Sequence, residues 1–213
     1  LEAKVGREAL QAFLRGYFDH FAFQSISTEQ FRGWLQSELL AAHPGLVSAA
    51  EIDEWLYQPG LPASAVLPQS AAFARVDALR DEWLASTRTA ASLPAASWST
   101  FEWLRFLDGL PVPTPVARLA ELDAKWGLGA QGNAMIRRSW LLAAIRAGYE
   151  PAMPQLEQYL LTIGRRMLIR PLYTELMKTA AGAQRARRIY AQARPGYHSI
   201  TTQVLDRIVH NTP

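Results

Sequence analysis

Apolar residues recur every three or four positions along most of this chain, which is the spacing of one face of an α-helix. Phe13, Tyr17 and Phe21 show this spacing early, and Ile136 and Trp140 show it again far downstream. Paired strands would need alternating apolar and polar residues, β-branched enrichment and a hairpin dipeptide, and no segment combines these features. The pattern therefore predicts an all-α protein without a sheet.

Start and stop signals divide the chain into about ten helices joined by short loops. Ser27 with Gln30 fits a capping box that opens a helix near 28–42. Pro68 suits the first position of a helix of about 20 residues, and Thr114 is expected to cap a helix that Pro115 begins. Four more helices are expected near residues 151–163, 171–180, 182–193 and 199–209.

Short loops make consecutive helices run antiparallel, so hairpins of helices are the natural building unit. The economical architecture is a two-layer α-α superhelix, a right-handed stack of helical hairpins of the HEAT or armadillo kind, or else an irregular bundle. No signature repeats at a fixed period of about 30 to 47 residues, which argues against an ordinary tandem-repeat module. Residues 1–213 are predicted to form one helical domain.

Composition describes a globular chain, because 49% of the 213 residues are hydrophobic and 19% are charged. The chain has no cysteine, which excludes thiol nucleophiles, cysteine-bound zinc and iron–sulfur clusters. No run of about 18 apolar residues occurs, so no membrane partner is predicted. Because no leader is visible in the printed sequence, we expect a cytoplasmic location.

Charge is distributed unevenly along the chain. Residues 1–136 hold 10 Lys and Arg against 15 Asp and Glu, whereas residues 137–213 hold 12 against 4. The C-terminal third therefore carries the positive field, which attracts nucleic acid, anionic lipid or an acidic partner domain. A free-standing helical scaffold that binds a protein or a nucleic acid through this third is one functional hypothesis.

Known catalytic motifs are missing from the sequence. The four histidines are too far apart in the sequence for an H-E-x-x-H zinc motif, and no G-x-S-x-G elbow is present. Residues 127–132 match G-x-G-x-x-G but lie between two predicted helices, so they are interpreted as a connecting loop. We therefore predict no catalytic residue, no metal and no cofactor in this chain, and no activity for the chain alone.

The most informative segment runs from Gly164 to Pro171 and holds Arg165, Arg166 and Arg170. Because a residue before proline favours extended backbone, an extended stretch over 165–170 would place Arg165 and Arg166 on opposite sides. A guanidinium held between a glycine and a proline could serve as a fixed receptor for a carboxylate. The other interpretation is that these arginines cap helix carbonyls or pair with acidic surface residues.

Three stretches of the sequence resemble one known family in order and in spacing. They are FAFQSISTEQF at 21–31, EWLYQPGLP at 54–62, and GRRM at 164–167 followed by RPLY at 170–173. The chain, from about residue 5 to about residue 209, resembles the C-terminal helical domain of zinc aminopeptidases of the leukotriene hydrolase and aminopeptidase B group, which are gluzincin metallopeptidases. The WLYQPGLP run is the most specific of these motifs.

The resemblance implies a three-part parent, with a β-rich domain, a catalytic domain bearing the H-E-x-x-H zinc site, and this helical domain closing the cleft. The catalytic domain is absent from this chain, so its expected partners are that domain and a peptide substrate. The family's carboxylate-clamping arginine maps onto Arg165, and the lysine two positions later maps onto Met167. Arg166 and Arg170 are the nearest residues that could compensate for the missing lysine.

Two functional hypotheses follow. The leading one is a non-catalytic domain of a zinc-dependent aminopeptidase that shapes the cleft and supplies Arg165 to orient the substrate carboxylate, while the parent removes N-terminal residues from short peptides. The alternative is the scaffold described above. Nucleic acid is disfavoured as a partner, because the arginines are spread over several helices and no recognised binding motif is present.

Overall fold

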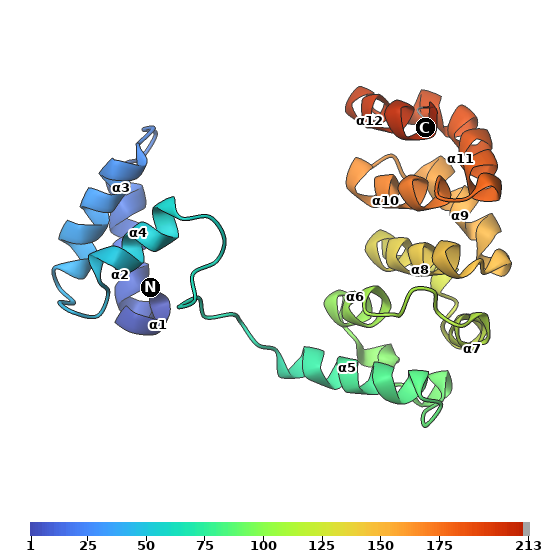
Figure 1. Ribbon diagram of the computed structural model, residues 1–213, viewed down its shortest axis with the longest axis horizontal. Helices are drawn as coiled ribbons and strands as arrows, with labels where there is room; N and C mark the ends of the chain where they lie inside the picture. Colours follow the sequence, from blue (N-terminus) through green and yellow to red (C-terminus); the bar gives the residue numbers. More distant parts are fainter. Residues whose placement is uncertain (211–213) are drawn as a thin grey trace. The chain divides into compact units, whose positions relative to one another are not determined.

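The structure is a computed structural model that describes residues 1–210. Within this range it contains twelve α-helices and no strand, as Figure 1 shows, which confirms the predicted all-α class. Contacts divide the chain into two compact units, residues 1–69 and the residues from Ser70 onward, called here the N-terminal and C-terminal units. That both units act as one domain stays a prediction.

The N-terminal unit is a small helical bundle. Its helices are α1 (Glu2–Val5), α2 (Arg7–His20), α3 (Thr28–Leu35) with a π-helical turn over Gln36–Leu40, and α4 (Ala49–Tyr57). The predicted capping box of Ser27 and Gln30 is present and opens α3. The unit has its own core, formed by Val5, Phe13, Leu35, Leu39, Leu40 and Ile52.

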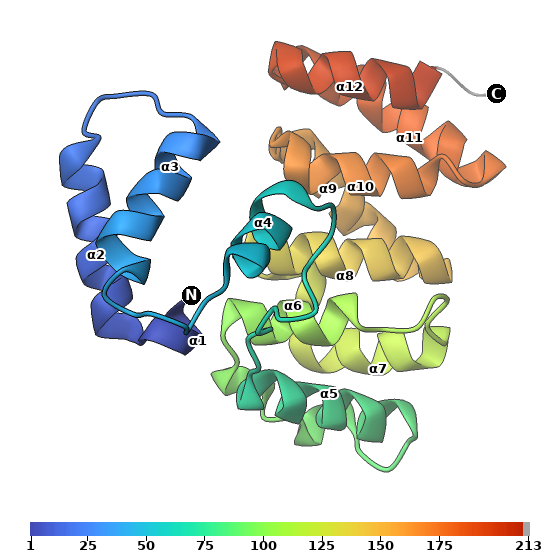
Figure 2. The same ribbon diagram turned by 60° about the vertical axis from the view of Figure 1, so that its left-hand side comes forward.

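The C-terminal unit is a stack of helices in two layers. One layer contains, in spatial order, α5 (Ala71–Leu84), α6 (Thr100–Asp108), α8 (Ala134–Ala147), α10 (Arg166–Leu176) and α12 (Ser199–His210). The other layer contains α7 (Val116–Trp126), α9 (Met153–Thr162) and α11 (Ala180–Ala193). Figure 2 shows the same order of α5, α6, α8, α10 and α12 from a second direction. The predicted stack of helical hairpins is confirmed for this unit.

Large apolar side chains between the two layers form the core of the C-terminal unit. Trp83, Trp140 and Tyr159 are fully buried, as the helical periodicity of the sequence requires. The Gly127–Gly132 segment is a turn between α7 and α8, so it is the connecting loop predicted from the sequence. None of the described helices combines the length and the apolar content needed to cross a bilayer.

Three predicted helix starts are wrong. The helix expected near 171–180 is α10, which begins at Arg166. Helix α5 begins at Ala71 instead of Pro68, because the hydroxyl of Ser70 accepts a hydrogen bond from the Phe73 N–H and caps the helix there. Thr114 does not cap α7, because its hydroxyl donates a hydrogen bond to the carbonyl of Pro111, 2.8 Å away in the preceding loop.

Glu121 joins α5, α7 and the turn between α5 and α6. Its carboxylate accepts hydrogen bonds from the indole N–H of Trp83 (3.2 Å), the backbone N–H of Ala90 (2.7 Å) and the guanidinium of Arg118 (2.7 Å). Partial burial opposes ionisation of this carboxyl, but the three hydrogen bonds outweigh burial and lower its pKa. Charge-assisted hydrogen bonds at Glu121 therefore stabilise one end of the stack.

The lowered pKa of Glu121 predicts a pH-dependent stability. A group whose pKa is lower in the folded state stabilises the fold above its unfolded value of 4.5, and this contribution is lost as pH falls through the folded pKa. We expect Glu121→Gln to lower the unfolding free energy by about 1 to 3 kcal/mol near neutral pH. The difference from wild type should shrink between about pH 5 and about pH 3 in urea titrations. A difference that is constant over this range would contradict the assignment.

Candidate functional site

The segment between α9 and α10 carries the arginines singled out by the sequence. Helix α9 ends at Thr162, and Arg165 is the N-cap of α10 with φ −72° and ψ 111°. Helix α10 then begins at Arg166 and contains Pro171 in its interior. The prediction of an extended stretch over 165–170 is therefore wrong from Arg166 onward, and Arg165 alone keeps extended backbone.

Burial explains why the helix continues through Pro171. The proline removes one hydrogen bond, to the carbonyl of Met167, and the residue before it prefers extended backbone. Against these local costs, the helix places a complete apolar stripe in the core, where each side chain is at most 6% exposed: Leu168, Ile169, Leu172, Tyr173 and Leu176. The burial of five large side chains outweighs the loss of one backbone hydrogen bond.

The helix places the three arginines differently from the predicted arrangement. Arg166 and Arg170 are four residues apart and share one face of α10, and Arg165 precedes the helix. All three side chains and Met167 are exposed. Within residues 1–210 none of the three guanidiniums forms a hydrogen bond or an ion pair. The described residues therefore do not support the interpretation that these arginines cap helix carbonyls or pair with acidic surface residues.

Positive charge at this position is unfavourable for the helix itself. The N-terminus of a helix carries a partial positive charge, and like charges four residues apart repel each other. The first turn of α10 contains no acidic residue to offset these costs. Local rules are broken most often at functional sites, so this uncompensated cluster is the best candidate for binding an anionic group.

The acidic residues of the basic C-terminal third are all paired. All four acidic residues of 137–213 form ion pairs with arginines from the same region: Glu150 with Arg185 (2.8 Å), Glu157 with Arg188 (2.6 Å), Glu175 with Arg146 (3.0 Å) and Asp206 with Arg194 (2.9 Å). Hydrogen bonds from Arg194 and Tyr190 hold the pKa of Asp206 below its usual range, so the last pair stays ionised. Arg165, Arg166 and Arg170 lie outside these pairs and follow one another closely at the start of α10.

Side chains from the end of the chain hold the backbone before Arg165. The hydroxyl of Thr201 donates to the carbonyl of Gly164 at 3.3 Å. The ring of Tyr197 lies against Gly164, where an added Cβ would meet it at 3.5 Å, and its hydroxyl donates to the carbonyl of Leu160 at 2.5 Å. The hydroxyl of Tyr173, in α10, lies 3.2 Å from that of Tyr197. The loop is thus attached to α12 and to both helices it connects.

Two residues that hold this site, Tyr197 and Thr201, carry no signal in the sequence. Tyr197 and Thr201 lie more than thirty residues from Gly164 and match no motif, so only the folded chain reveals their role. Burial raises the pKa of Tyr173 and of Tyr197, so both phenols stay protonated and keep their hydrogen bonds over the whole neutral range.

No metal site is found in the described part of the chain, since no three His, Asp or Glu residues lie close enough to hold an ion. The residues present therefore do not fit zinc, whose sites need three or four such ligands. We predict that the 213-residue chain, purified and dialysed into metal-free buffer, contains no stoichiometric zinc by elemental analysis. One tightly held zinc per chain, with hydrolysis that depends on it, would contradict this prediction.

The WLYQPGLP motif lies on an exposed apolar surface of the N-terminal unit. Trp55 and Tyr57 are about half exposed at the end of α4, and Leu61 is 71% exposed in the loop that follows. Trp55 also lines a groove of about 620 Å³, together with Phe31 and Val66. Large contiguous apolar surfaces of this kind mark contacts with another part of a protein or with a partner.

Comparison with known proteins relates the C-terminal unit to one family. The model of the family described as leukotriene A4 hydrolase, C-terminal, matches residues 98–209, which lie wholly within that unit. The fold is similar to that of native leukotriene A4 hydrolase from Saccharomyces cerevisiae, with a TM-score of 0.79 and 21% identity over 99% of this chain and 37% of that one. The resemblance drawn from the sequence is thereby confirmed.

Three curated relatives match nearly the whole chain. Leukotriene A-4 hydrolase of Xenopus laevis is 23% identical over 96% of this chain and 34% of its own length. Aminopeptidase B of Mus musculus is 24% identical over 96% of this chain and 32% of its own length. Leucine aminopeptidase 2 of Aspergillus clavatus is 26% identical over 97% of this chain and 34% of its own length. The chain spans about a third of the length of these relatives. Because the family model covers more than half of its residues, the chain belongs to the leukotriene A4 hydrolase C-terminal family.

Proposed function

We propose that this chain is the helical C-terminal part of a zinc-dependent aminopeptidase, in which Arg165 binds the terminal carboxylate of a peptide substrate. The observation that carries the proposal is the exposed, unpaired arginine cluster at the start of α10, next to a loop anchored at Gly164. A fixed guanidinium suits this task, because its two parallel N–H groups match the two oxygens of a carboxylate.

The residues have different parts in this proposal. Arg165 lies on the anchored, non-helical segment, so its Cα position is set by the contacts of Gly164. Arg166 and Arg170 lie on the exposed face of α10 and add positive potential, which partly replaces the lysine that the family carries where this chain has Met167. In the parent, zinc in the catalytic domain would supply the activated water, and this chain would hold the far end of the substrate.

The catalytic domain is the partner that we assign to the apolar surface of the N-terminal unit. Phe18, Phe23 and Val66 in this unit are each at least 67% exposed, and Trp55 is 51% exposed. The curated relatives are about three times as long as this chain, so a catalytic domain covering this surface agrees with their length. We place the whole protein in the cytoplasm. No specific observation favours the alternative scaffold.

The experiment that tests the proposal compares substrates of the full-length parent. A tripeptide should be hydrolysed with a kcat/KM well above that of its C-terminal amide, because the neutral amide cannot form the charge-assisted hydrogen bonds to Arg165. The preference should be reduced in high salt, since exposed charges are screened. Equal kcat/KM values for the acid and the amide would exclude recognition of the carboxylate.

A further inference from the structure

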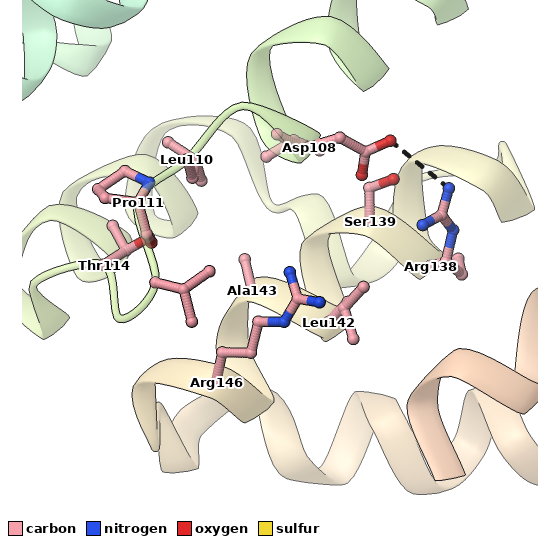
Figure 3. Close-up of a pocket in the computed structure, with 11 residues that line it drawn as sticks. Asp108, Leu110, Pro111, Thr114, Arg138, Ser139, Leu142, Ala143 and Arg146 are labelled. Carbon is pink, nitrogen blue, oxygen red and sulfur yellow. Dashed lines mark hydrogen bonds and ion pairs between the residues drawn. The ribbon is translucent and has the colours of Figure 1, made fainter. Parts of the chain in front are cut away.

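A cavity of about 230 Å³ lies between the end of α6, the segment 109–114 and α8 (Figure 3). Apolar side chains form much of its wall, namely Leu107, Leu110, Val112, Leu142 and Ala143. Polar side chains complete the wall, and these are Asp108, Thr114, Arg138, Ser139 and Arg146. None of these residues takes part in the carboxylate site at the start of α10, so the cavity has no role in the function proposed above.

Ser139 is the first sign that the cavity binds a ligand. Its side chain comes from α8, and the residue is only 2% exposed. Within residues 1–210 its hydroxyl has no hydrogen-bond partner. A helical serine usually bonds to the carbonyl four residues earlier, and an unpartnered buried hydroxyl is both costly and rare. A partner in the cavity would remove this cost.

Arg146 supplies the second sign. Its Nε donates to Glu175 at 3.0 Å, and within residues 1–210 neither of its terminal nitrogens has a partner. Figure 3 shows the guanidinium of Arg146 rising from α8 to lie beside Ala143 and Leu142, where it lines the cavity. The fork of a guanidinium with two free nitrogens is suited to bind a planar carboxylate.

The other charges in the wall balance each other. Arg138 and Asp108 approach to 3.6 Å and form an ion pair, drawn as a dashed line in Figure 3. The hydroxyl of Thr114 donates a hydrogen bond to the carbonyl of Pro111. Arg146 shares the carboxylate of Glu175 with Lys178, whose Nζ lies 2.8 Å from it, so these three groups leave one positive charge uncompensated. Among the described residues of the wall, the carboxylate is that of Asp108, and it faces Arg138. This balance matches a ligand with one negative charge.

We propose that this cavity binds a small carboxylate with an apolar body. The carboxylate accepts hydrogen bonds from the terminal nitrogens of Arg146 and from the hydroxyl of Ser139, and the apolar body packs against Leu110, Val112 and Leu142. Pockets that hold drug-sized ligands start at about 300 Å³, and this cavity of about 230 Å³ is smaller. The ligand is therefore a molecule of a few carbons. Inorganic phosphate suits the cavity less well, because it has no group for the apolar wall and brings more than one negative charge.

The test uses the 213-residue chain labelled with ¹⁵N and titrated with three probes. These are isovalerate, its neutral isostere isovaleramide, and inorganic phosphate. We expect isovalerate to shift the amide signals of Ser139, Leu142 and Ala143 in a saturable manner in the millimolar range. Isovaleramide and phosphate should bind about tenfold more weakly or not at all. Absence of saturable binding of isovalerate, or equal binding of either other probe, would overturn the proposal.

Variants separate the proposed contacts from general charge effects. Ser139→Ala removes no hydrogen bond of the ligand-free chain, so Tm should not fall while isovalerate binding weakens roughly fivefold. Arg146→Gln should abolish saturation, with the fold checked by circular dichroism. Arg75→Gln, a change of the same charge on the exposed surface of α5, is the matched control and should bind like wild type. Equal loss of binding in Arg75→Gln, or full binding in Ser139→Ala, would contradict the assignment.

Discussion

Replacing Arg165 with alanine in the full-length protein is expected to lower kcat/KM for short peptides by about 30- to 1,000-fold. This range corresponds to a loss of roughly 2 to 4 kcal/mol, the scale of charge-assisted hydrogen bonds. Aminoacyl anilides should be nearly unaffected, because they have no terminal carboxylate and so lose no contact. Steady-state kinetics on a peptide and an anilide with the same N-terminal residue measure both effects.

Two neighbouring positions provide controls for Arg165→Ala. Arg166→Ala removes the same charge from the first turn of α10 and should have a much smaller effect, because this side chain lies on the helix instead of the anchored loop. Met167→Lys should lower KM for peptides, since it restores the positive charge of the family pattern on an exposed position. Equal slowing of peptide and anilide by Arg165→Ala would show general destabilisation and would contradict the clamp.

Much of the fold can be predicted from local signals. Ser27 with Gln30 predicts the start of α3, and Gly148 predicts the end of α8, where it adopts the left-handed conformation that glycine tolerates. The apolar periodicity predicts the helices, because side chains at helical spacing meet the core on one face. These signals depend on residues within one or two turns of each other, so they can be recognised in a single sequence.

The details of the candidate site depend on residues that are distant in sequence. The local rule that a residue before Pro171 is extended predicts the wrong backbone for Arg170, because burial of Leu172 and Tyr173 favours the helix. The anchoring of Gly164 by Thr201 crosses 37 residues and has no local pattern. The position of Arg165 in the sequence was therefore predictable, but its place at a helix N-terminus was not.

The sequence also does not indicate that contacts group the chain into two compact units. Short loops and continuous periodicity favour one stack, and the stretch between α4 and α5, with Pro59, Pro62 and Pro68, has the composition of an ordinary loop. The structure gives each unit a separate core, and no pattern of apolar spacing reports which helices share a core. Helical periodicity shows that a face is buried without showing what covers it.

Replacing Tyr173 with alanine is expected to destabilise the C-terminal unit by about 3 to 5 kcal/mol. The side chain is fully buried in α10, packs edge-to-face against Tyr190 with ring centroids 5.6 Å apart, and lies beside the hydroxyl of Tyr197. Alanine leaves a cavity that the two-layer stack can close only in part. Hydrogen exchange of the α10 amides in the full chain measures the opening free energy of this unit separately from the N-terminal unit.

Tyr173→Phe is the matched control, because it keeps the ring and removes only the hydroxyl. It should cost about 0.5 to 1.5 kcal/mol, since Tyr197 keeps its hydrogen bond to the Leu160 carbonyl. Thr201→Val releases only the carbonyl of Gly164, so it should speed hydrogen exchange at the amides of 163–166. It should lower the stability of α10 less than Tyr173→Ala does. If Tyr173→Phe destabilised α10 as much as Tyr173→Ala does, the hydroxyl would be the main stabilising group. Packing of the ring would then not be what holds the start of α10, and with it Arg165, in place.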